Sequence, residues 1–100
     1  MEKREFKDKA YLLWSQLVKA MANPHRLEIL DLLSQAEWTV EKIANETHLS
    51  IANASQHLQQ LRKARLVSIR KDGNYIFYKL ASIDVYRSLD GLKALATEGG

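Results

Sequence analysis

The residues of this chain best suited to specific chemistry are the amides and hydroxyls between Ser50 and Arg65, SIANASQHLQQLRKAR. If this stretch is helical, its apolar residues share one narrow stripe, and the opposite face is polar and uncharged at its start. The stripe consists of Ile51, Ala54, Leu58 and Leu61. A side-chain amide can pair with adenine at two positions, and a serine can pair with several bases. We therefore expect four residues to contact bases: Asn53, Ser55, Gln56 and Gln59.

Positive charge follows at the far end of this stretch, where Arg62, Lys63 and Arg65 are placed to meet phosphates. Residues 51–80 carry six Lys or Arg against one acid, a net charge of +5, whereas residues 1–50 and 81–100 each have a net charge of −1. Such segregation is expected of a protein that docks on a polyanion. An ordinary solvated helix with chance clustering of charge is the alternative.

The rest of the composition limits the class of protein. A chain of 100 residues forms one domain, which we assign to residues 1–100. No run approaches the ~20 apolar residues of a membrane span, and the amino terminus does not have the pattern of a secretory signal, so we expect a soluble, cytoplasmic protein. The absence of cysteine excludes disulfides and thiolate metal ligands. Without clustered carboxylates, a glycine-rich phosphate loop or a serine with an evident base, we do not expect an enzyme.

Four further helices must position the Ser50–Arg65 stretch, and periodicity predicts them at about residues 2–22, 24–35, 39–48 and 82–96. Asn23-Pro24 separates the first two, because proline disfavours a helical residue before it and asparagine is a good N-cap. The second of these helices has the densest apolar pattern and is expected at the centre of the core. The two short helices that meet at residues 48–50 match helix-turn-helix geometry, although the turn has no glycine.

After Arg65 the pattern alternates around Asp72-Gly73-Asn74, which predicts a two-stranded hairpin over residues 66–80. We expect Tyr75 and Phe77 to share the apolar face of Val67 and Ile69. Basic side chains at the tip and edges predict a wing that contacts the backbone or the minor groove of a duplex. The expected fold is therefore mainly α with a small β-hairpin.

The first and last predicted helices carry more apolar surface than one packing partner requires. In the first helix, one apolar stripe can line the core. A second copy of the chain is the simplest cover for the other stripe, since closed two-fold dimers are the commonest assembly. A small domain that buries both stripes internally is the alternative. The residues expected at the interface of a homodimer are Phe6, Tyr11, Trp14, Val18, Tyr86, Leu89, Leu92 and Leu95.

The order of the elements, with NPHRLEILDLL leading in and LSIANASQHLQQLRKARLV at the polar helix, resembles the ArsR/SmtB family of dimeric winged helix-turn-helix transcriptional repressors. The resemblance covers nearly the whole chain. It implies that helix 50–65 enters the major groove and that two copies of the chain read a palindromic operator in double-stranded DNA. It also implies that a small-molecule inducer, whose chemistry the sequence does not specify, releases the protein from the DNA. Carried over by position, the residues that contact or border the backbone are Ser50, Arg62, Arg70, Lys71, Tyr75 and Lys79.

The chain departs from the metal motifs of that family. Residues 39–41 are Thr-Val-Glu where many members have Cys-Val-Cys. Asp84 matches the first of four zinc ligands that other members place between their last helices, but Tyr86 and Thr97 replace the two histidines, and one oxygen ligand cannot hold zinc. The three histidines fall on separate predicted elements: His25, His48 and His57. We therefore expect no metal and no other cofactor.

A winged-helix module that docks another protein through its polar helix or its wide apolar first helix is the alternative to DNA binding. Some relatives with a similar NASQHL run continue into a rhodanese-like sulfur-transfer domain. By this resemblance, the chain could be one domain of a longer protein.

Overall fold

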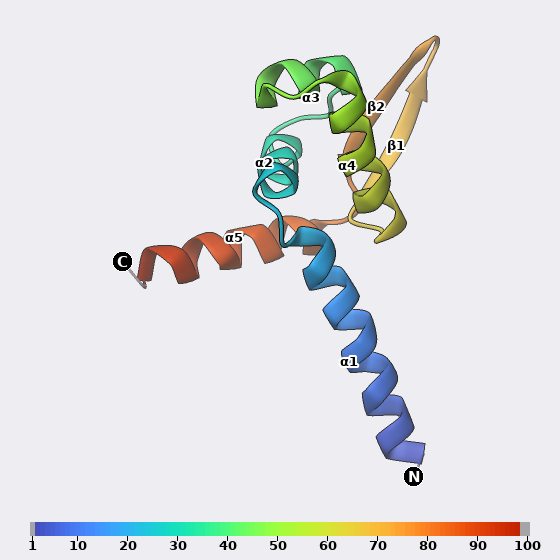
Figure 1. Cartoon of the computed structure of the whole chain (residues 1–100), viewed down its shortest axis with the longest axis vertical. Helices are drawn as coiled ribbons and strands as arrows, with labels where there is room; N and C mark the ends of the chain where they lie inside the picture. Colours follow the sequence, from blue (N-terminus) through green and yellow to red (C-terminus); the bar gives the residue numbers. More distant parts are fainter. Residues whose placement is uncertain (1, 99–100) are drawn as a thin grey trace.

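The computed structural model describes residues 2–98, which form five helices and one antiparallel hairpin (Figure 1). In chain order the elements are α1 (Glu2–Met21), α2 (Pro24–Leu33), α3 (Val40–Thr47), α4 (Ile51–Lys63), β1 (Val67–Asp72), β2 (Tyr75–Leu80) and α5 (Ile83–Glu98). The first and last residues of each helix and strand lie within two residues of the positions that the sequence predicts. The expectation of a mainly α fold with a small hairpin is confirmed.

Capping side chains start the three helices at the centre of the fold. Asn23, Thr39 and Ser50 precede α2, α3 and α4, and all three have extended backbone conformations. Their side-chain oxygens each accept a hydrogen bond from the backbone N–H three residues later, at 3.1, 3.3 and 3.0 Å. Each cap satisfies one of the four backbone donors that the first turn of a helix leaves unpaired.

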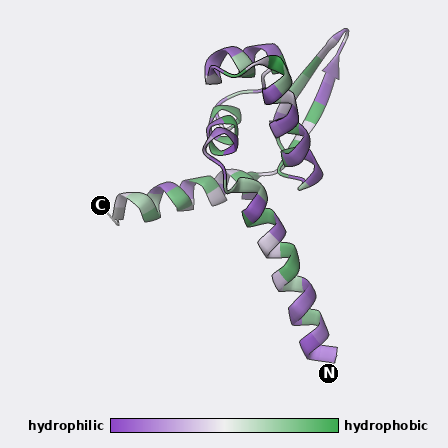
Figure 2. Ribbon diagram, in the orientation of Figure 1, coloured by the Kyte–Doolittle hydropathy of each residue, from purple (hydrophilic) through white to green (hydrophobic). Residues whose placement is uncertain are grey.

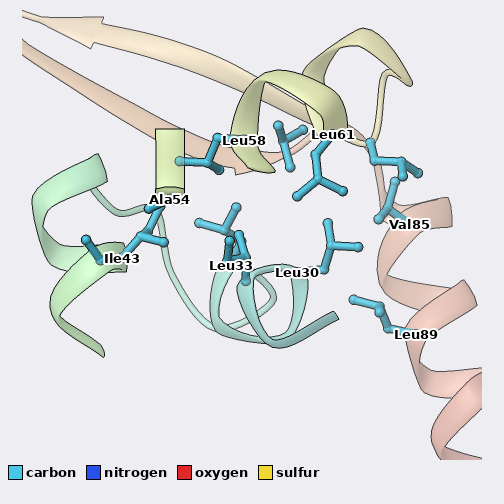
Figure 3. Close-up of a cluster of buried hydrophobic side chains, with 12 residues drawn as sticks. Leu30, Leu33, Ile43, Ala54, Leu58, Leu61, Val85 and Leu89 are labelled. Atoms are coloured by element: carbon cyan, nitrogen blue, oxygen red, sulfur yellow. The ribbon is translucent and has the colours of Figure 1, made fainter. Parts of the chain in front are cut away.

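The core lies where α2, α3, α4 and α5 meet, as Figure 3 shows. Ile29 and Leu30 of α2 are fully buried, and so are Leu58 and Leu61 of α4. The prediction that α2 is the central core element agrees with this arrangement. The buried hydrophobic residues are Ile29, Leu30, Leu33, Ile43, Ala44, Ala54, Leu58, Leu61, Leu66, Val67, Val85 and Leu89.

One residue of the predicted stripe on α4 does not join this core. Ile51 is 53% exposed, whereas Ala54, the next member of the stripe, is fully buried. Ile51 is the first residue of α4, and the hydrophobic cluster does not extend to it. The predicted stripe is therefore buried from Ala54 onward but not at Ile51, which stands at the first position of the helix and outside the core cluster.

The turn length of the hairpin decides which side chains share a face. Asp72 pairs with Tyr75 across the two-residue turn Gly73-Asn74. Gly73 has a φ of 59°, the conformation that glycine provides at the first central position of a tight hairpin turn. This turn pairs odd-numbered residues of β1 with even-numbered residues of β2. Tyr75 and Phe77 therefore lie on the face of Arg70, and the prediction that they share the face of Val67 is wrong.

The loop between α2 and α3 joins the hairpin to the helices. Trp38 and Tyr78 exchange two backbone hydrogen bonds, at 3.1 and 2.8 Å, so the loop adds a short antiparallel bridge beside β2. The indole N–H of Trp38 also donates to the carbonyl oxygen of Leu32 at 3.3 Å. A two-stranded hairpin alone is marginally stable in water, and these contacts give it a fixed support.

The turn between α3 and α4 works without glycine because His48 itself adopts the left-handed conformation, with a φ of 57°. The N–H of Leu49 then donates to the carbonyl oxygen of Ala44 at 3.0 Å, the long hydrogen bond of a Schellman helix end. Arg65, with a φ of 61°, ends α4 in the same way, and Leu66 donates to Leu61 at 2.9 Å. Both helices of the motif therefore stop at a residue held in a strained backbone conformation.

The first helix extends away from the rest of the molecule (Figure 1). None of its described residues is buried, and only Leu17, Ala20 and Met21 near its end pack partly against the core. The prediction that a whole stripe of this helix lines the core is thus right only for its last turns. Figure 2 shows apolar residues along the extended part of α1 as well. No helix in residues 2–98 combines the length and the apolar character needed to cross a membrane.

We predict that His48→Gly stabilises the fold and that His48→Ala destabilises it. Glycine adopts a positive φ without the steric cost of a Cβ, which is about 1–2 kcal/mol, while its greater freedom in the unfolded chain takes back part of that gain. The free energy of unfolding in urea should rise by up to about 1 kcal/mol for glycine and fall for alanine. Equal effects of the two substitutions would show that the φ of His48 does not limit stability.

Candidate nucleic-acid interface

The polar face of α4 is held at the surface by the burial of its opposite stripe. Ala54 and Leu58 are fully buried, and Asn53, Gln56 and Gln59 are exposed on the other side. Ser55 is half-buried on the flank. Among the described residues, no side-chain hydrogen bond engages the three amides. They are therefore able to donate and accept with an external partner.

The start of α4 adds a site suited to an anion. Ser50 is exposed, and its hydroxyl oxygen already accepts from the N–H of Asn53 at 3.0 Å. Its O–H is still able to donate. The other N–H groups of the first turn and the positive end of the helix dipole lie beside it, an arrangement that favours a phosphate oxygen.

Cations border this helix at two places. Arg62 and Lys63 are exposed in its last turn, and Lys71 and Lys79 lie on the hairpin that follows. Within the described part of the chain, none of these four side chains forms an ion pair. Arg65 differs in position, because it borders an apolar groove between α1 and α5.

Arg70 is a predicted backbone contact whose charge the protein itself pairs. Its Nε donates to Glu37 Oε1 at 2.6 Å, and Nη1 lies 3.7 Å from Asp72. The guanidinium also stacks over the ring of Phe77, 4.7 Å from its centroid, because the hairpin register places these residues opposite each other. Arg70 lowers the pKa of Glu37 chiefly through this hydrogen bond, and Glu37 in turn raises the pKa of Arg70. Arg70 thus connects the wing to the α2–α3 loop.

The wing also exposes two apolar side chains, of which sequence reasoning assigned Tyr75 but not Ile76. Tyr75 is 66% exposed at the start of β2, and its ring lies 6.4 Å from that of Phe77. Ile76, on the other face, is 44% exposed. The alternation of residues 75–80 separates Ile76 from Tyr75 and Phe77. It assigns Ile76 to the face of Val67 only once the length of the turn is known.

A second surface, distinct from the polar face of α4, is an apolar groove of about 650 Å³ between α1 and α5. Trp14 and Val18 of α1 and Leu92 of α5 line it, and all three are exposed. Phe6, Tyr11, Tyr86 and Leu95 add exposed surface on the same two helices. Leu89 does not belong to this surface: it is 5% exposed and packs in the core of its own chain, because it faces α2 with Val85.

The histidines are less scattered than the sequence suggested. The rings of His25 and His57 lie 5.7 Å apart, because the start of α2 packs beside the middle of α4. His48 remains apart, at the turn before α4. In the described residues, no three of the histidine and carboxylate side chains are grouped so that they could hold a metal ion.

A helix-turn-helix with an amide-rich second helix, followed by a supported basic hairpin, defines the winged helix-turn-helix class of domains. The model of the bacterial regulatory protein family arsR matches residues 23–68, which run from the cap of α2 into β1. Over 79 residues the chain is 40% identical to the transcriptional activator HlyU of Vibrio cholerae, a match that covers 79% of this chain and 73% of HlyU. The chain belongs to the arsR family.

Two further relatives extend the comparison. The HTH-type transcriptional regulator Rv0324 of Mycobacterium tuberculosis is 42% identical over 80 residues, which is 80% of this chain but only 35% of that protein. The solution structure of a homodimeric winged helix-turn-helix DNA-binding domain from Mycobacterium bovis superposes with a TM-score of 0.87 at 38% identity, and the match covers 92% of this chain and 85% of that one. These relatives favour DNA binding over the protein-docking alternative.

We predict that the pKa of Glu37 lies below 4.5 and returns toward that value in Arg70→Ala. A lowered carboxyl pKa stabilises the folded state above pH 4.5, and this contribution is lost as the pH falls through the lowered value. An NMR titration of the Glu37 carboxyl carbon measures the change. Lys71→Ala, which removes a neighbouring cation outside the pair, should leave the titration unaltered. An unchanged midpoint in Arg70→Ala would show that the pair does not form in solution.

Proposed function

We propose that this chain is a transcription regulator that binds duplex DNA as a homodimer and reads an operator with α4 in the major groove. One observation carries the proposal: an exposed row of uncharged amides lies beside cations that no side chain of the described residues neutralises. Amides suit base edges, and cations suit phosphates. Ordinary surface helices do not require this separation of the two kinds of side chain along one element.

Each predicted residue has a role in this proposal. The base contacts come from Asn53, Ser55, Gln56 and Gln59. Backbone contacts come from Ser50, Arg62 and Lys63 around α4 and from Lys71, Tyr75 and Lys79 on the wing. The ion pair of Arg70 with Glu37 supports a different role for that residue, namely holding the wing at a fixed angle to the helices.

The second copy of the chain covers the apolar groove. A groove of about 650 Å³ with exposed tryptophan, tyrosine and leucine on its two helices is unfavourable in water, and a two-fold axis brings the same surface of a partner onto it. The homodimeric state of the Mycobacterium bovis relative supports this assembly. Two α4 helices in one dimer would then read half-sites about one helical turn apart, hence a palindrome.

Repression is the mode of regulation that the family resemblance supports. A dimer that occupies an operator excludes other proteins from the same stretch of DNA. The relative HlyU is named an activator, so activation is the second candidate mode.

We predict that Gln56→Ala and Lys71→Ala weaken DNA binding in different ways. The operator is first selected from a random pool of duplexes, and affinities are then measured by fluorescence anisotropy across salt concentrations. Gln56→Ala should cost about 1–3 kcal/mol on the operator and little on random DNA, because it removes a base contact. Lys71→Ala should weaken binding to all sequences alike and reduce the salt slope by about one. Equal losses for Gln56→Ala on operator and random DNA would exclude a base-reading role.

We predict that Leu95→Glu converts the dimer into a monomer without unfolding it. Leu95 is 66% exposed on α5 and makes no contribution to the chain's own core, so a charge there is costly only when a second copy covers it. Sedimentation equilibrium measures the mass, and circular dichroism measures the helix content. The matched control is Ile76→Glu, at a 44% exposed apolar residue of the wing, which should remain dimeric. A dimeric Leu95→Glu would place the interface elsewhere.

A further inference from the structure

Arg26 connects three helices at the back of α4. It lies in the first turn of α2, where its backbone N–H is bound by the Asn23 cap. Its side chain reaches out in two directions: Nε donates to Nδ1 of His57 in α4 at 3.2 Å, and Nη1 donates to the carbonyl oxygen of Ala20 in α1 at 3.3 Å. One guanidinium therefore joins the polar helix to the end of the helix that carries the apolar groove.

The electrostatics of α1 and α2 explain where the guanidinium points. A cation is disfavoured at the start of a helix and favoured at its end. Ala20 lies in the last turn of α1, where carbonyl oxygens have no partner within the helix. Among the described residues, no carboxylate forms an ion pair with Arg26. The side chain is thus satisfied by neutral acceptors, and the imidazole of His57 is one of them.

This hydrogen bond requires a particular state of His57. The Nε of arginine always carries its hydrogen, so Nδ1 of His57 must be unprotonated to accept it. The hydrogen of the neutral ring is then on Nε2, and a further proton on Nδ1 makes the ring a cation. This removes the acceptor and leaves two cationic groups whose nearest nitrogens, Nε of Arg26 and Nδ1 of His57, are 3.2 Å apart. The charged or titratable groups that act on this imidazole are Arg26 and His25, both from α2. Partial burial, followed by the charges of Arg26 and His25, lowers the pKa of His57 from 6.5.

We propose that Arg26 is a positioning residue for DNA reading, which fixes the rotation of α4 against the end of α1 through His57 and releases it when that imidazole takes up a proton. The inference rests on the proposed function. His57 follows Gln56 directly and lies about one turn after Asn53, so a small rotation of α4 at this hydrogen bond moves both amides, although the buried stripe keeps them on the outer face. On a helix about 10–12 Å across, a rotation of about 20° moves a side-chain tip by about 2 Å, more than a hydrogen bond tolerates.

The two hydrogen bonds of Arg26 also connect the dimer surface of α1 to α4. The apolar surface of α1 is covered only in the homodimer, and the Ala20 carbonyl is at the end of that helix where it meets the core. A change in the seating of α1 would reach His57 through the side chain of Arg26, in addition to the direct packing of the end of α1 on α4. The sign with pH follows from the lowered pKa: the contribution of the neutral imidazole is present above pH 6.5 and is lost as the pH falls through the lowered value.

The test combines a measurement on the free homodimer with one on DNA. Nitrogen-15 NMR of the His57 ring should show an unprotonated Nδ1 at neutral pH and give the midpoint of protonation in acid. Anisotropy titrations should then show that the ratio of operator affinity to random-duplex affinity falls about tenfold as the pH is lowered, with a midpoint at the same pH. Binding to random DNA and its salt slope should not fall, because the phosphate contacts lie elsewhere.

Two variants at the link and one beside it separate positioning from general stability. His57→Gln keeps an acceptor that does not titrate, so it should retain selectivity across the whole range. Arg26→Ala should be poorly selective at every pH, and circular dichroism checks that it is folded. The matched control is His25→Gln, which removes the neighbouring imidazole from the same turn as Arg26 and should keep the loss in acid.

Three results would overturn the inference: a protonated Nδ1 at neutral pH, selectivity that does not change with pH in the wild type, or the same loss in His57→Gln as in the wild type. The His57→Gln variant keeps the test decisive if Arg26→Ala does not fold. A wild-type protein that binds no duplex at any pH would instead overturn the proposed function, and the ring NMR would still decide whether the Arg26–His57 bond exists.

Discussion

The packing of α4 on α2 is the constraint on which the rest of the structure depends. Ala54, Leu58 and Leu61 have no exposed surface, and they meet Ile29 and Leu30, which have none either. Because a helix has only about 3.6 residues per turn, burying one stripe this completely determines which side chains of the helix face outward. The amides of α4 are presented as a row at the surface for this reason, and the caps and Schellman ends keep the helix at a fixed length.

The α2–α3 loop supports the wing that follows α4. Two residues of this loop support it: Trp38 pairs with β2, and Glu37 forms an ion pair with Arg70 of β1. The lysines of the wing are therefore held at a set distance from α4. The pair is exposed, and its contribution to stability is small in water. Its value is geometric, since the guanidinium is fixed from three sides by Glu37, Asp72 and Phe77. A cation used in this way is less available to a phosphate than its neighbour Lys71 is.

The long α1 and α5 helices present the opposite situation, with apolar surface that the chain does not bury. Trp14, Val18 and Leu95 are each more than half exposed, and the groove between the helices is lined largely by carbon. Arg26 lies where the end of α1 meets α4, and it forms one hydrogen bond with each of these two helices. The fold therefore places the surface suited to a second copy and the surface suited to DNA at the two ends of one short connection.

The sequence by itself determined the elements, their order and the exposed character of the α4 face, because these follow from local periodicity, capping and turn residues. Asn23 caps α2 as predicted, and Thr39 and Ser50 cap α3 and α4 through the same short-range contact, since a cap acts within three residues. Only the tertiary structure decided which face of β2 joins the core, that Leu89 is internal while Ile51 is not, that Arg70 is held by Glu37, and that His25 and His57 approach each other. Each of these depends on contacts between residues distant in sequence, or on a single residue of turn length, and neither periodicity nor composition carries that information.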